Sequence, residues 1–110
     1  MNVVWDLGAV LLHWRPAGLL ARLLPRHIAD AADAARWSEA FFQLGGDWHA
    51  FDRGTVTVAE LVGRISVRTG LRAEQVQAVV DAVPAELQPI DGSVALLHAL
   101  HAAGHRQYYL

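Results

Sequence analysis

The stretch Val3-Val4-Trp5-Asp6-Leu7-Gly8 decides how this chain is interpreted. Its first residues are apolar, as in a buried strand of a parallel sheet, and the carboxylate of Asp6 follows them directly. Sites in α/β proteins lie at the carboxyl ends of such strands. Gly8 gives the turn that follows a backbone freedom that other residues lack. We therefore predict a strand over residues 2–5, with the Asp6 side chain facing a crevice at its end.

The other end of the chain predicts a helix and then a second strand. The helix is expected over residues 91–103, Gly104 ends it, and residues 106–110 read as a strand. Two parallel strands joined by a crossover fit this order. The roughly 70 residues between Trp14 and Pro84 far exceed the dozen or so that a simple crossover needs. They are predicted to form an inserted helical subdomain.

Within this insertion the sequence predicts several short helices. Leucines recur at helical spacing up to Pro25, and a second helix is expected over residues 28–35. Residues 37–42 give a further apolar face, which Gly45-Gly46 breaks. Asp47 is then placed to cap a short helix that ends at Gly54.

Two clearer helix signals follow. Thr57-Val58-Ala59-Glu60 fits the capping box, in which the Thr hydroxyl and the Glu carboxylate each satisfy a free amide at the helix start. This predicts a helix from Val58 to about Thr69, which Gly70 closes. Valines at positions 76, 79, 80 and 83 have the spacing of another amphipathic helix, and Pro84 is expected to stop it.

The composition narrows the class of protein. The chain has 110 residues, of which 54% are hydrophobic and 18% charged, and this suits one small globular domain. Its apolar runs are far shorter than the roughly 20 residues of a membrane span, so we expect a cytoplasmic protein with no membrane partner. The net charge of −2 and the scattered arginines argue against a nucleic-acid partner. Without cysteine there are no disulfides or thiolate ligands.

The segment around Asp6 resembles motif I of the haloacid dehalogenase (HAD) superfamily, in which a strand ends in an Asp nucleophile and a tight glycine-containing turn follows. It is most similar to the branch written F-D-L-G-G-V-L, which includes sugar-phosphate phosphatases. The resemblance implies an α/β fold: a fragment of a Rossmann-like core, with the first strand, one core helix and the start of a second parallel strand, and an inserted α-helical cap. We accordingly expect core residues at 1–14 and 89–110 and the cap at 15–88.

The same resemblance implies Mg²⁺-dependent hydrolysis of a small phosphorylated metabolite. Asp6 would attack the phosphorus and form an aspartyl phosphate. Mg²⁺ would bind the Asp6 carboxylate and the backbone carbonyl of Gly8, since it prefers hard oxygen ligands. Many phosphatases of the superfamily carry a second Asp, a general acid and base, at the position of Gly8. His13 is the nearest titratable group that could replace it.

Other parts of the family's site have no counterpart up to Leu110. These are the Ser or Thr that holds phosphate, a Lys that balances charge, and further acidic metal ligands; the chain contains no lysine at all. We therefore expect the N-terminal part of such an enzyme, inactive alone. His13, Arg15 and Trp48 are candidate substrate contacts, although the aromatic residues of the cap more often form its core, and Trp48 beside Gly45-Gly46 could do both.

Several alternatives stay open. Asp6 could merely cap a turn. The same Asp could attack carbon without a metal, as in a 2-haloacid dehalogenase, or the chain could be a non-catalytic helical interaction module. His98 and His101 could share a metal, although surface histidines near a helix C-terminus are commoner. A dinucleotide site is disfavoured because no G-x-G-x-x-G follows the first strand. Open strand edges further predict self-association.

Overall fold

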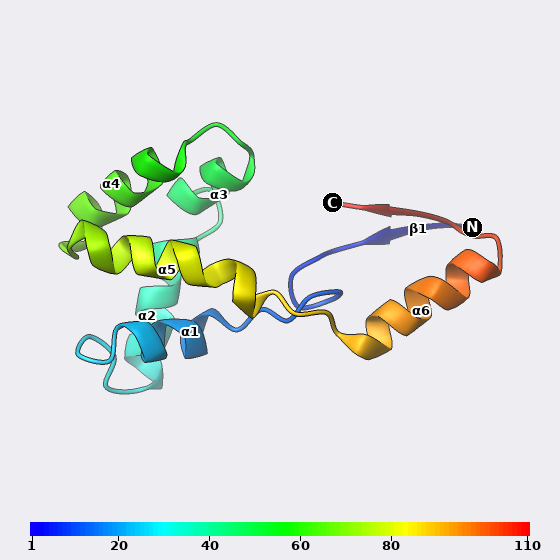
Figure 1. Cartoon of the computed structure of the whole chain (residues 1–110), viewed down its shortest axis with the longest axis horizontal. Helices are drawn as coiled ribbons and strands as arrows, with labels where there is room; N and C mark the ends of the chain where they lie inside the picture. Colours follow the sequence, from blue (N-terminus) through cyan, green and yellow to red (C-terminus); the bar gives the residue numbers. More distant parts are fainter. The chain divides into compact units, whose positions relative to one another are not determined.

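The computed structural model describes residues 1–110 and contains six helices and a two-stranded parallel sheet (Figure 1). The mixed α/β class predicted from the sequence is confirmed. Along the chain the elements are β1 (Asn2–Trp5), α1 (Pro16–Leu23), α2 (Ala31–Phe42), α3 (Asp47–Asp52), α4 (Val58–Thr69), α5 (Ala73–Glu86), α6 (Asp91–Ala102) and β2 (Arg106–Tyr109).

The chain divides into two compact units, which we describe separately. The sheet unit comprises Met1–Arg15 together with Pro84–Leu110, and the helical unit comprises Pro16–Val83. The elements of the sheet unit are thus contributed by the two ends of the chain, and the helical unit is inserted between them. The boundaries expected from the sequence, after residues 14 and 88, lie one and five residues from these divisions.

In the sheet unit, β1 and β2 pair in parallel with Val4 opposite Tyr108. The main-chain amide of Leu110 continues the ladder by donating to the carbonyl of Trp5 at 3.0 Å. The helix α6 precedes β2, and Gly104, with φ of +83°, ends it as predicted. Glycine suits this left-handed backbone because it has no Cβ to clash.

The two connections to the helical unit pair with each other inside the sheet unit. The amide of His13 donates to the carbonyl of Gln88 at 2.7 Å, and the amide of Ile90 donates to the carbonyl of Leu11 at 2.8 Å. An isolated antiparallel bridge lies between these two hydrogen bonds. We call residues 11–13 and 88–90 the neck.

The helical unit holds the principal hydrophobic core. The largest side chains with less than 2% exposure all lie in it: Phe41, Leu19, Leu20, Leu24, Leu61, Ile65, Val76 and Val79. The predicted capping box of α4 is confirmed, because the amide of Glu60 donates to the Thr57 hydroxyl at 3.2 Å and the amide of Thr57 donates to the Glu60 carboxylate at 2.8 Å. These contacts with Thr57 lower the pKa of the Glu60 carboxyl.

Three sequence-based predictions in the insertion are wrong. The helix expected over residues 28–35 starts three residues later and does not end at residue 35; α2 instead runs without a break through the aromatic residues that were expected to form a separate face. Asp30 explains the later start, because its side chain accepts the amide of Asp33 at 2.8 Å and so caps the helix there. The end of this helix at Phe42 agrees with the expected break at Gly45-Gly46.

The other two wrong predictions concern Asp47 and Pro84. Gly46 is the N-cap of α3 and Asp47 is its first residue, so the Asp47 carboxylate is free to accept hydrogen bonds from Arg68, at 2.9 and 3.1 Å. Pro84 lies inside α5, which continues to Glu86. A proline so near the helix end removes one hydrogen bond but leaves the last turn helical.

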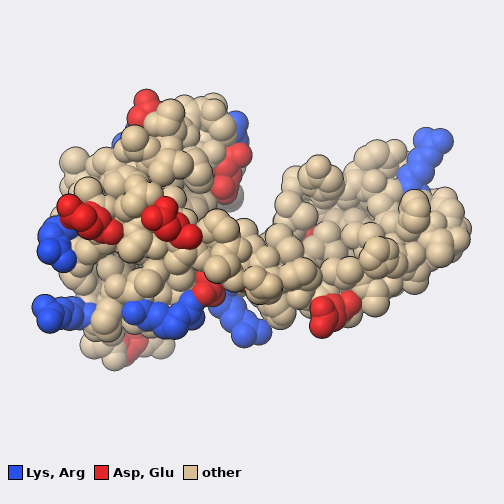
Figure 2. All heavy atoms as spheres, viewed as in Figure 1, with Lys and Arg blue, Asp and Glu red and all other residues tan.

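The sheet unit buries much less than the helical unit. No residue of α6 is buried, and in the strands Val4 is 60% exposed and Tyr109 is 76% exposed. Parallel strands are normally covered on both faces, so this sheet keeps apolar surface open. The unit also carries few charges: Asp6, Arg15, Glu86, Asp91 and Arg106. In the view of Figure 2 the red and blue spheres accordingly concentrate on the helical unit.

Candidate functional site

The loop after β1 folds back on itself directly behind Asp6. The carbonyl of Leu7 accepts the amides of Leu11 at 3.0 Å and Leu12 at 2.8 Å, and the amide of Ala9 donates to the carbonyl of Leu12 at 2.7 Å. The Asp6 side chain stays exposed at the carboxyl end of the strand. The structure therefore puts this carboxylate where a parallel sheet usually carries its site.

The residue of this loop with an unusual backbone conformation is Ala9, one residue later than expected. Ala9 has φ of +62°, the left-handed region that favours glycine, and it is the only non-glycine residue with positive φ. Gly8 does not adopt that conformation, and a Cβ built on it would approach Trp14 no closer than 3.8 Å, an ordinary contact. The special backbone geometry predicted for Gly8 is wrong in position, and Ala9 carries it.

We expect Ala9→Gly to stabilise the chain by up to about 1 kcal/mol. A left-handed conformation costs a non-glycine residue about 1–2 kcal/mol, and the added flexibility of glycine in the unfolded chain offsets about half of that. The matched control is Ala99→Gly within α6, which should destabilise by about 1 kcal/mol. Urea unfolding of both variants checks this, and an equal loss of stability in the two would contradict it.

The groups available to a cation in this loop are oxygen atoms. One carboxylate oxygen of Asp6, Oδ1, accepts the amide of Leu7 at 2.8 Å, and Oδ2 accepts no hydrogen bond. The carbonyl of Gly8 accepts none either. A carboxylate and a carbonyl oxygen two residues apart are suited to Mg²⁺, which commonly keeps several waters besides one or two protein ligands. The donor set therefore fits part of a Mg²⁺ coordination sphere.

The remaining candidate residues are distributed over both units. His13 lies in the neck and is half-buried. Arg15 is exposed and is the last residue of Met1–Arg15, the first part of the sheet unit. Both therefore share a unit with Asp6. Trp48 belongs to the helical unit.

Trp48 packs into the aromatic core of the helical unit. Its side chain is 8% exposed and makes edge-on contacts with Phe42 and Phe51, at 4.7 and 5.7 Å between ring centroids. Burial raises the pKa of the neighbouring Asp52 carboxyl, although the charge of His49 and a hydrogen bond with Trp48 act in the opposite direction. These contacts are those of a core residue, the alternative that the sequence left open.

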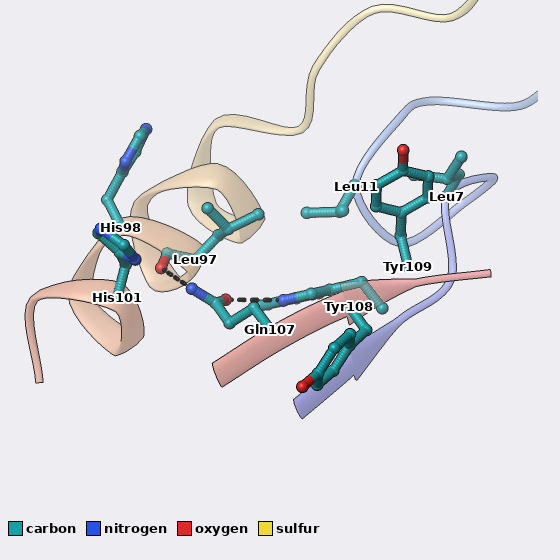
Figure 3. Close-up of a pocket in the computed structure, with 9 residues that line it drawn as sticks. Leu7, Leu11, Leu97, His98, His101, Gln107, Tyr108 and Tyr109 are labelled. Atoms are coloured by element: carbon teal, nitrogen blue, oxygen red, sulfur yellow. Dashed lines mark hydrogen bonds between the residues drawn. The ribbon is translucent and has the colours of Figure 1, made fainter. Parts of the chain in front are cut away.

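The sheet unit also contains an apolar hollow that the sequence did not indicate (Figure 3). It has a volume of about 410 Å³ and lies between α6 and the sheet. Its floor is fixed by Gln107, which accepts the indole N–H of Trp5 at 2.8 Å and donates to the carbonyl of Leu97 at 2.9 Å. The walls come from three distant stretches of the chain, namely Trp5, Leu7, Leu11, Leu97, His98, His101, Gln107, Tyr108 and Tyr109. Only the tertiary fold brings these residues together.

The histidines of α6 lie at this hollow and stay exposed. His98 and His101 both project from the helix, as Figure 3 shows. No group of three or more His, Asp or Glu side chains in the structure is arranged to hold a metal ion.

The comparisons with known proteins do not place this chain in a family: no protein-family model, curated protein or solved structure matches it. Among its helices, none has the length and apolar character needed to cross a membrane.

Proposed function

We propose that this chain carries the nucleophile and the inserted helical unit of a HAD-like, Mg²⁺-dependent phosphatase that acts on a small phosphate monoester. The observation that carries the proposal is the exposed Asp6 carboxylate at the end of β1, followed by a compact loop that leaves the Gly8 carbonyl without a hydrogen bond. The parallel pairing of β1 with β2, the position of α6 before β2 and the insertion of a helical unit after β1 support the proposal.

In this proposal one carboxylate oxygen of Asp6 attacks the phosphorus and the other would bind Mg²⁺, while the amide of Leu7 donates to Oδ1. A bond forms between the carboxylate oxygen and phosphorus, and the bond from phosphorus to the substrate oxygen breaks, with its electron pair leaving on the alkoxide. Water then hydrolyses the aspartyl phosphate, which releases inorganic phosphate and restores Asp6. The hydrogen bond from Leu7 orients the carboxylate before attack. Mg²⁺, held by Asp6 and the Gly8 carbonyl, would offset negative charge when bound.

Proton transfer to the leaving alcohol has no carboxylate at Gly8 to perform it. His13 is the nearest titratable side chain along the chain, and its main chain is held in the neck by the hydrogen bond to Gln88. A substrate with a good leaving group needs no such proton donor. We therefore expect the aspartyl phosphate to form most readily from an activated phosphoryl donor, although its hydrolysis still lacks a general base.

A second candidate function is a helical interaction module without catalysis. The observation in its favour is that Asp6 already accepts the amide of Leu7, a local structural contact that requires no ligand. The two candidates differ in their response to Mg²⁺, which a turn-capping Asp does not require.

Titration with Mg²⁺ tests the proposal without requiring turnover. In ¹H–¹⁵N NMR spectra we expect Mg²⁺ to shift the amide signals of Leu7, Gly8 and Ala9, with saturation. Asp6→Asn, which keeps the shape and loses the charge, should abolish the shifts, while Asp91→Asn, a matched change elsewhere in the sheet unit, should leave them intact. Shifts that persist in Asp6→Asn, or their absence in the parent chain, would exclude this site and favour the interaction module.

A further inference from the structure

The outer edge of β2 presents main-chain groups that pair with nothing in the chain. The amides of Arg106 and Leu110 donate to β1, at 3.2 and 3.0 Å, so the even-numbered residues of β2 face its partner strand. In a parallel pair the residues between them point their amides and carbonyls the other way. These are Gln107 and Tyr109, whose N–H and C=O groups form an open edge.

One face of the sheet is open as well. Side chains alternate between the two faces of a strand, and in Figure 3 the ring of Tyr108 points to the opposite side of the sheet from that of Tyr109. On the Tyr108 side, Val4 lies directly opposite Tyr108 in the register. These two side chains are 60% and 50% exposed, so no helix covers them.

The charges on this open face are arranged with opposite signs at its two ends. Arg106 lies at the amino end of the sheet, and Asp6 lies at the carboxyl end, beyond Trp5. Arg106 belongs to the even-numbered set that shares a face with Val4. Asp6 continues this alternation one residue beyond β1, where the amide of Leu110 still donates to the carbonyl of Trp5. Both are exposed, and Arg106 has no ion-pair partner within the chain.

We propose that the β2 edge is a homodimer interface, occupied by β2 of a second copy in antiparallel orientation. The result is a continuous four-stranded sheet with a two-fold axis at Tyr108. Gln107 of each copy exchanges two main-chain hydrogen bonds with Tyr109 of the other, and the two Tyr108 rings meet as a close cross-strand pair. This inference does not depend on the proposed function.

The same register brings the opposite charges together. Arg106 of one copy lies opposite Leu110 of the other, and Asp6 occupies the next strand, on the same face. Two strand spacings amount to about 9.6 Å, which the extended Arg and Asp side chains can bridge between them. Antiparallel pairing of β1 edges through Asn2 and Val4 would instead leave Asp6 beyond the start of the partner strand. Charge complementarity therefore selects the β2 edge.

Cysteine cross-linking tests the register directly, because the chain has no cysteine of its own. Residues of such a close antiparallel pair have Cα atoms about 4.5 Å apart, within the range for a disulfide. Tyr108→Cys should therefore form a disulfide-linked dimer under mild oxidation. Val4→Cys, equally exposed on the same face but distant from the axis, should stay reduced. Equal cross-linking of the two variants would overturn the register.

Sedimentation velocity with charge reversal tests the interface without a disulfide. The parent chain should dimerise as its concentration rises. Arg106→Glu and Asp6→Arg should each raise the dissociation constant about tenfold or more, because like charges then face each other, and the double variant should restore it. A monomeric parent chain would refute the proposal, as would a double variant no better than either single one. None of these readouts depends on phosphatase activity.

Discussion

The 110-residue chain is expected to hydrolyse p-nitrophenyl phosphate with Mg²⁺ no faster than its Asp6→Asn variant. Phosphoryl transfer depends on several preorganised charges that act together, and removing members of such a set loses nearly all of the rate. This chain has no lysine to balance charge, and Gly8 offers no carboxylate for proton transfer. For this substrate, whose leaving group needs no proton donor, the missing carboxylate matters as the base that would activate water to hydrolyse the aspartyl phosphate, and such general-base help corresponds to about 10²–10⁴ in rate.

The measurement is initial-rate turnover with the parent chain and Asp6→Asn purified identically, each with Mg²⁺ and with EDTA. Circular dichroism of both establishes that the substitution leaves the fold intact. Mg²⁺-dependent activity of the parent above that of the variant would show that Arg or His side chains of this chain complete the site, contrary to our interpretation.

Ile65→Ala is expected to lower the free energy of unfolding by about 2–5 kcal/mol, the range for removing a large aliphatic side chain from a well-packed core. Ile65 lies on α4, is 0% exposed, and belongs to the core of the helical unit. Val67→Ala is the matched control, because Val67 is also β-branched, lies on the same helix and is 88% exposed. Its replacement should change stability by less than about 0.5 kcal/mol.

Urea unfolding followed by helical circular dichroism distinguishes the two variants. A similar midpoint for Ile65→Ala and the parent chain would mean that this residue does not pack in solution as it does in the structure. Loss of stability in Val67→Ala would mean that the exposed side of α4 is covered in solution.

Local signals predicted the elements whose ends are set by their own residues. The capping box at Thr57 and the left-handed Gly70 fix α4, and each acts within a single helical turn. The start of α2 differs from the prediction because the Asp30 side chain caps the helix by accepting the amide of Asp33. Pro84 does not stop α5 as predicted, because a proline in the final turn of a helix removes only one hydrogen bond.

The candidate site divides in the same way. The sequence places Asp6 directly after a short apolar strand, and the structure shows its side chain exposed there, whereas the crevice that Asp6 was expected to face stays a prediction. The left-handed backbone conformation was expected at Gly8 because glycine adopts it most easily. The structure has it at Ala9, whose amide donates to the carbonyl of Leu12. The hollow beside α6 was missed because its lining residues are far apart in the sequence.

The neck has a consequence for how this architecture can evolve. Because residues 11–13 and 88–90 are already joined by hydrogen bonds, the ends of the insertion stay together whatever the chain does between them. Each doubling in length of a flexible loop adds only about 0.6 kcal/mol to the cost of closing it. Segments of very different size can thus be exchanged at this point while the strand that bears Asp6 keeps its pairing. The neck therefore allows the sequence and length of the helical unit to change in evolution without altering the residues at the end of β1.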